Sequence, residues 1–193
     1  MLTADQKLRQ GTYNPREGQA LWWSMYDRAV FDSAGANPLQ YTFYTERLGE
    51  NGKTLSDTNV RANGQIPTGM KFEANALEIF YVPNAAKTAA EIQNMTDAIR
   101  TGHFIFNITS KSNQLELPLT QLFGNPFPVI LNQVSNEIYS RASYTGTWEL
   151  PIPIVLAADV SFDATINFSV APNASLDTDV FYLSMVGPLV TLQ

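Results

Sequence analysis

Apolar and polar side chains alternate in the stretch AADVSFDATINFSV, residues 157–170, without interruption from Ala158 to Val170. A period of two puts the apolar and polar sets on opposite faces of an extended strand, and no helix accommodates such a pattern. The stretch therefore predicts one long strand of about 40 Å, which covers a core with its apolar side. A strand of that length needs a second sheet against it, so we expect a β-sandwich.

Seven other segments show a strand-like period or an apolar run between turn residues. They are residues 39–45, 70–82, 104–109, 115–119, 137–144, 148–156 and 180–190. In residues 70–82 the alternation changes phase near Ala76, which predicts a β-bulge or a switch of sheet there. Pro151 and Pro153 cannot donate ladder hydrogen bonds, so residues 148–156 are expected at a sheet edge or in a bulged region. The polar residues 49–69 predict a long exposed loop, where a sandwich often makes its contacts.

Two segments show helical spacing instead. Thr88 and Glu91 have the spacing of a capping box and Gly102 stands where helices commonly stop, so one helix is expected between the second and third strands. A short amphipathic helix is predicted for residues 19–31, after a polar arm in residues 1–18. Apolar side chains on more than one face of this helix either pack on the domain's own core or contact another subunit. The candidate subunit-contact residues are Leu21, Trp22, Trp23 and Tyr26.

Composition indicates one domain without covalent staples. The chain has 193 residues, and its 45% of hydrophobic residues are enough for one large core, with no linker-like stretch dividing it. We expect a single domain in residues 39–193, preceded by the arm and helix in residues 1–38. The chain has no cysteine, which excludes a disulfide framework and thiolate chemistry. The first residues lack the pattern of a signal peptide, so synthesis in the cytoplasm is expected.

Residue types for catalysis and metal binding are scarce. His103 is the only histidine, which excludes His-ligated zinc sites and two-histidine metal sites. A Ser-His-Asp triad would have to use His103, and no serine has the glycines of a nucleophile elbow. Asp159 and Asp163 share a face of the expected strand but lie roughly 13 Å apart, too far for a glycosidase pair. We expect no enzyme, no cofactor and no metal.

Several short motifs resemble a known family. They are Gly49, Lys53-Thr54, Asp57-Thr58-Asn59, Gln65-Ile66-Pro67, the Gly102-His103-Phe104 hairpin and the C-terminal run from Leu183 to Leu189. Through these motifs, residues 39–190 resemble the jelly-roll coat proteins of tailless icosahedral bacteriophages. Eight strands with one inserted helix also suit a single eight-stranded jelly roll, and the chain is too short for the two barrels that some members of the family contain.

The resemblance implies a structural virion protein, a major capsid subunit that self-assembles into hexamer-like capsomers of an icosahedral shell. Its partners would be copies of itself and other capsid proteins, with an internal membrane as a further candidate. The formal net charge of -6 argues against direct nucleic-acid binding, which needs clustered Lys and Arg. The alternative is a carbohydrate-binding β-sandwich, lectin-like or a host-attachment module, in which Trp22, Trp23 and Trp148 would stack on sugar rings. Size-exclusion chromatography and a glycan screen would separate the two.

Overall fold

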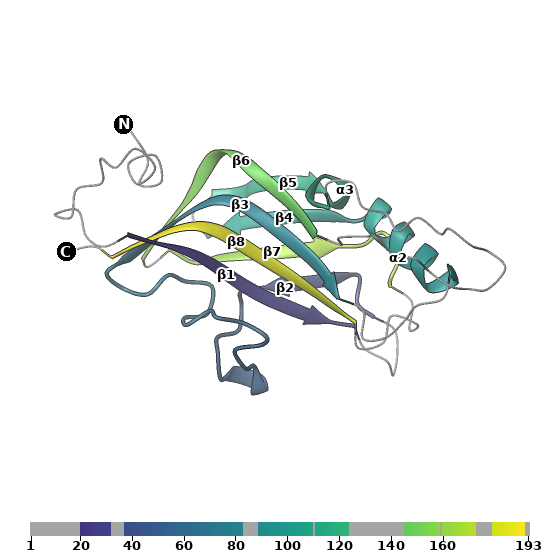
Figure 1. Ribbon diagram of the computed structural model, residues 1–193, viewed down its shortest axis with the longest axis horizontal. Helices are drawn as coiled ribbons and strands as arrows, with labels where there is room; N and C mark the ends of the chain where they lie inside the picture. The colour runs from purple at the N-terminus through teal and green to yellow at the C-terminus, as the bar shows by residue number, and fades with distance from the viewer. Residues whose placement is uncertain are drawn as a thin grey trace.

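Eight strands form two four-stranded antiparallel sheets that face each other (Figure 1), which confirms the all-β class. The computed structural model describes residues 20–31, 37–82, 89–109, 111–123, 145–158, 160–172 and 179–191. In the first sheet the order is β1-β8-β3-β6, from the strands Ala20–Val30, Val180–Thr191, Met70–Val82 and Thr145–Ala157. In the second it is β2-β7-β4-β5, from the strands Gln40–Phe43, Phe162–Asn167, His103–Ile108 and Lys111–Pro118.

Strand pairing follows one simple rule along the chain. β4 pairs with β5, β3 with β6, β2 with β7 and β1 with β8, each time antiparallel. Successive pairs belong alternately to the two sheets. The chain thus has the connectivity of one long hairpin, folded between β4 and β5 and rolled up so that its pairs build both layers.

The core between the sheets is rich in aromatic side chains. Phe72 of the first sheet and Phe104 of the second are wholly buried. The ring centroid of Phe168 lies 6.4 Å from that of Phe31 and 6.2 Å from that of Phe181, so residues from both layers meet there. Helices α2 (Ala89–Thr101) and α3 (Leu119–Leu122) lie together at one end of the sandwich (Figure 1). They add Met95, Ala98, Ile99, Leu119 and Leu122 to the core.

Several expected elements are confirmed. β3 spans Met70–Val82, and its pairing with β6 shifts register between Ala74 and Ala76, where the bulge is predicted. α2 ends at Thr101, directly before Gly102, and β4 and β5 form the expected hairpin. β6, which carries both prolines, is an edge strand. The loop between β2 and β3 contains only one short 3₁₀ turn, η2 (Glu50–Gly52).

The helix predicted for residues 19–31 is wrong, because residues 20–30 form β1. The sequence of β1 does not show a strand's alternation of apolar and polar residues. The charged Asp27 occupies a buried position two residues after the buried Met25, and the large apolar Trp22 is exposed. β1 pairs with β8 along its whole length, and this pairing makes it part of the sandwich. Eight strands are therefore found in the described residues, as predicted, but the set differs. The strand expected at residues 137–144 lies outside the described residues.

The single long strand predicted for residues 157–170 is also wrong. β6 ends at Ala157 in one sheet and β7 begins at Phe162 in the other, so the chain changes layer between them. Val160 still packs against the core, which is why the alternation continues through the crossing. Within β7 the predicted inward face is confirmed, but Thr165, predicted to face outward, is only 5% exposed.

Candidate functional site

The four candidate contact residues lie on β1 but do not form one surface. Leu21 is 65% exposed and Trp22 is 49% exposed. Trp23 packs instead on the core, edge-on to Phe72 with 6.3 Å between ring centroids. Tyr26 is partly buried, and its hydroxyl donates a hydrogen bond to the carbonyl of Leu55. The exposed apolar surface of β1 is therefore limited to Leu21 and Trp22 at its start and Val30 at its end; we call Leu21 and Trp22 the β1 patch.

The opposite edge of the same sheet carries a second apolar surface. On β6, Ile152 is 80% exposed and Val155 is 52% exposed. Pro151, in the same strand, is exposed as well. We call Pro151, Ile152 and Val155 the β6 patch. Exposed apolar surface of this kind commonly marks a contact site.

Strand register puts the two patches at nearly the same level. Leu21 lies opposite Leu189, Leu189 opposite Phe72, and Phe72 opposite Leu156. These four residues form one row that runs straight across the sheet from edge to edge. Trp22 and Val155 are each one residue away from an end of that row, so the two patches lie on opposite edges of the sheet at nearly the same level along the strands.

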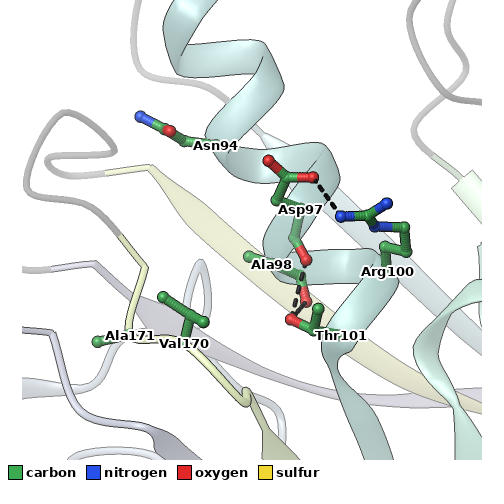
Figure 2. Close-up of a pocket in the computed structure, with 7 residues that line it drawn as sticks. All are labelled: Asn94, Asp97, Ala98, Arg100, Thr101, Val170 and Ala171. Atoms are coloured by element: carbon green, nitrogen blue, oxygen red, sulfur yellow. Dashed lines mark hydrogen bonds and ion pairs between the residues drawn. The ribbon is translucent and has the colours of Figure 1, made fainter.

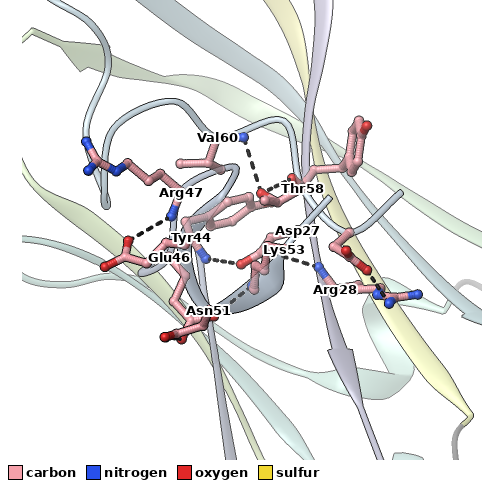
Figure 3. Close-up of polar contacts among 12 residues, drawn as sticks. Asp27, Arg28, Tyr44, Glu46, Arg47, Asn51, Lys53, Thr58 and Val60 are labelled. Atoms are coloured by element: carbon pink, nitrogen blue, oxygen red, sulfur yellow. Dashed lines mark hydrogen bonds and ion pairs between the residues drawn. The ribbon is translucent and has the colours of Figure 1, made fainter. Parts of the chain in front are cut away.

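A network of charged and polar groups joins the loop between β2 and β3 to β1 (Figure 3). Asp27 of β1 is fully buried. Its carboxylate accepts hydrogen bonds from the Lys53 ammonium at 2.6 Å, from the Tyr44 amide at 2.6 Å and from the Arg28 amide at 3.0 Å. The Lys53 ammonium also lies 3.5 Å from a carboxylate oxygen of Glu46. Burial raises the pKa of Asp27 above its usual value, although Lys53 and the amide donors oppose that shift.

A second ion pair joins Arg28 of β1 to Asp57 of the loop. Burial alone would raise the pKa of Asp57, but the amide and hydroxyl of Thr54, together with the Arg28 charge, lower it below its usual value. Tyr44, whose amide bonds Asp27, is fully buried, and its hydroxyl donates to the carbonyl of Leu183 at 3.0 Å. Burial raises the pKa of this phenol well above its usual value.

Residues 53–60, which we call the strap, lie along β1. Thr58 forms an antiparallel bridge with Asp27, and its hydroxyl donates to the carbonyl of Tyr26 at 3.0 Å. Asn59 accepts from the Tyr26 amide at 2.9 Å and donates to the Ser24 carbonyl at 2.7 Å through its side chain. The sequence motifs singled out Lys53 and Asp57-Thr58-Asn59 but gave no indication of Asp27, which is the partner of Lys53 and Thr58, because an Asp in an apolar stretch predicts an exposed position.

Two shallow cavities lie on the surface. One of about 220 Å³ is lined by Arg28, Lys53, Asp57 and their neighbours, whose charges already pair with one another. The other, of about 350 Å³, lies between α2 and residues 170–171 (Figure 2). There Arg100 pairs with Asp97 at 3.1 Å, and the Thr101 hydroxyl donates to the Asp97 carbonyl at 2.9 Å. The charged groups of the first cavity, and the Asp97, Arg100 and Thr101 groups of the second, thus bond to the protein itself.

The part of the chain that the structure describes holds no cluster of three His, Asp or Glu residues placed to bind a metal ion. His103 lies in β4, partly buried. Trp23 and Trp148 pack against the core, so the three tryptophans do not form one exposed platform.

No protein-family model matches the sequence, and a comparison with curated proteins finds no match. Among the described residues no helix is long and apolar enough to cross a membrane.

Proposed function

We propose that this protein is a capsid subunit of an icosahedral bacteriophage, a structural protein without catalytic activity that is located in the virion. The fold proposed for it is the single jelly roll. The pairing of β1 with β8, β2 with β7, β3 with β6 and β4 with β5 supports that assignment, because a jelly roll consists of eight strands in two sheets connected as two Greek keys. The motifs quoted from the sequence support it independently.

The observation that carries the function is the placement of the two apolar patches. In the proposed capsomer, the β6 patch of one copy meets the β1 patch of the next. Because Leu21 and Leu156 lie in one row, this contact needs almost no shift along the strands between neighbouring copies. A head-to-tail contact related by rotation alone closes into a ring, whereas one with a shift builds a helical filament. A ring is the form that a capsomer requires.

The chemistry of the β6 edge favours contact through side chains. Pro151 and Pro153 cannot donate hydrogen bonds to an added strand. Ile152 is the most exposed of the large apolar residues among the described positions, at 80%. An aliphatic side chain of this kind gains most by burial against an apolar surface such as Trp22, an aromatic residue type that is enriched at interface centres.

Assembly of the purified protein tests the proposal. Light scattering and electron microscopy of the unmodified protein should show rings or shells, and Ile152→Lys should abolish them while leaving the thermal melt unchanged. The matched control is Val170→Lys, since Val170 is an exposed aliphatic residue, 67% accessible, outside both patches. A protein that stays monomeric at all concentrations, or an Ile152→Lys variant that assembles normally, contradicts this contact.

The partners proposed beyond copies of the chain are other capsid proteins and an internal membrane, which the family resemblance implies. Mixing experiments with the other virion proteins and with vesicles would test these partners separately. The rival function, carbohydrate binding, would appear in a glycan screen as a hit that depends on Trp22, with no assembly of the protein alone.

A further inference from the structure

β1 is an edge strand, and the edge of a sheet is a template for strands of other molecules. Its residues direct their backbone groups alternately toward β8 and away from it. The amide and carbonyl of Tyr26 and the carbonyl of Ser24 point away from β8, because they bond to Asn59 and Thr58 of the strap. Without the strap, this part of the edge would present unsatisfied donors and acceptors.

The strap satisfies these groups largely with side chains. The amide side chain of Asn59 bonds the Tyr26 amide and the Ser24 carbonyl, as a residue of a neighbouring strand would. The backbone amide of Asn59 adds a longer bond of 3.3 Å to the Tyr26 carbonyl. Because most of these bonds come from the side chains of Asn59 and Thr58, the strap covers the edge through a single bridge, Thr58 to Asp27, and not as a continuous strand.

Polar contacts fasten the strap on the N-terminal side of Asn59. Lys53 bonds Asp27, Asp57 bonds Arg28, and the hydroxyl of Tyr182 on β8 donates to the Ser56 carbonyl at 3.0 Å. Leu55 at the tip is 62% exposed, whereas Val60 at the end is 1% exposed and anchors the strap in the core. A segment with little apolar burial opens locally at a lower free energy than the whole domain.

We propose that the strap is an edge guard, which keeps the edge of β1 from Ser24 to Asp27 from pairing with a strand of a second copy of this chain. Contacts between copies are thereby restricted to side-chain patches, and strand-to-strand association of the subunit is suppressed. The guard goes beyond the capsid role: it concerns which contact is prevented, whatever the protein assembles into.

The test is Asn59→Ala, with Asn63→Ala as the matched control, because Asn63 is an exposed asparagine in the same loop. Loss of the Asn59 bonds should speed hydrogen exchange of the Tyr26 amide about tenfold, a change equivalent to roughly 1.4 kcal/mol. Sedimentation velocity, run below the concentration at which the unmodified protein assembles, should then show new oligomers, with intermolecular β-sheet in the infrared spectrum. The control should match the unmodified protein in both measurements.

Two further variants keep the outcome decisive. Thr58→Val removes one hydroxyl from the same edge and replaces Asn59→Ala in the test if Asn59→Ala does not fold. It should also speed exchange of the Tyr26 amide and produce new oligomers. Ser24→Pro, added to Asn59→Ala, should reverse the association, because a proline at Ser24 removes the amide that a new strand would need. Faster exchange at Tyr26 without new oligomers, or unchanged exchange, overturns the guard. A failure of the capsomer proposal is seen separately, as absence of rings from the unmodified protein.

Discussion

Phe168 lies just after β7, where the two layers meet, and is 4% exposed. Its ring contacts Tyr41, with 6.0 Å between centroids, as well as Phe31 and Phe181. Phe168→Ala should lower the free energy of unfolding by about 3 to 5 kcal/mol, through lost burial and the cavity left behind. Denaturant melts measure the loss, and Val170→Ala, two residues further at an exposed position, should change it by less than about 0.5 kcal/mol. A loss below about 1 kcal/mol for Phe168→Ala contradicts its place in the core.

The buried Asp27 and its neighbour Asp57 should give opposite pH dependences. The folded-state pKa of Asp27 is raised, so its contribution to stability is fully present below its unfolded pKa of 3.8 and is lost as pH rises through the folded value. The folded-state pKa of Asp57 is lowered, so its contribution is present above 3.8 and is lost as pH falls through the folded value.

Chemical denaturation from pH 3 to pH 7 of the unmodified protein, Asp27→Asn and Asp57→Asn measures both effects. The stability of the unmodified protein relative to Asp27→Asn should fall as pH rises above about 4. The stability of the unmodified protein relative to Asp57→Asn should fall as pH drops below about 4. If the stability differences for the two variants depend on pH in the same direction, then burial of Asp27 and the Thr54 bonds to Asp57 do not shift the two pKa values in opposite directions.

At the scale of strands, Gly187 permits the close approach of β8 to β3. A Cβ at this position would lie 1.9 Å from the Glu73 carbonyl oxygen, which is backbone and cannot rotate away. The approach coincides with the shift of register between Phe72 and Ala76. The bulge in β3 thus lies directly against Gly187 in β8, and the close approach of the two strands depends on that glycine.

Gly187→Ala should therefore destabilise the sandwich by about 1 to 3 kcal/mol or more, because the strands must move apart. Gly102→Ala is the comparison, since the atom nearest to its Cβ would be the end of the Leu119 side chain at 2.5 Å, which can change rotamer, and the nearest backbone atom, the Ala98 carbonyl oxygen, would lie at 3.0 Å instead of 1.9 Å. Thermal and denaturant melts should rank the loss for Gly187→Ala above that for Gly102→Ala. The reverse order would mean that the β3 bulge adapts more easily than the α2–α3 contact.

For the whole molecule, charge predicts weak contact with nucleic acid. The formal net charge is -6, and residues 1–18 carry Lys7, Arg9 and Arg16 against Asp5 and Glu17. Because the protein has few clustered Lys and Arg side chains to neutralise phosphates, it would release few counterions from nucleic acid. The free-energy gain from counterion release, which drives nonspecific binding, is therefore small. Filter binding to single- and double-stranded DNA and RNA at about 150 mM salt should give dissociation constants weaker than about 1 μM. Tighter binding that weakens steeply with salt would reveal a basic surface assembled from distant residues.

The sequence by itself determined the all-β class and the bounds of β3 and α2, and it limited β6 to a sheet edge or a bulged region. Each of these follows from local chemistry: a period of two, a helical stripe ended by Gly102, and prolines that cannot donate to a ladder. Where local pattern and tertiary environment agree, sequence reasoning succeeds.

Only the tertiary structure decided what β1 is and where the candidate surfaces lie. Asp27 is buried because Lys53 and the Tyr44 amide compensate its charge, and none of these partners is near it in sequence. β1 is a strand because β8, at the far end of the chain, pairs with it. The row from Leu21 to Leu156 likewise depends on three separate strand pairings. Such relations between distant segments leave no periodic trace in the sequence, since the free energy that selects them arises only when the layers close.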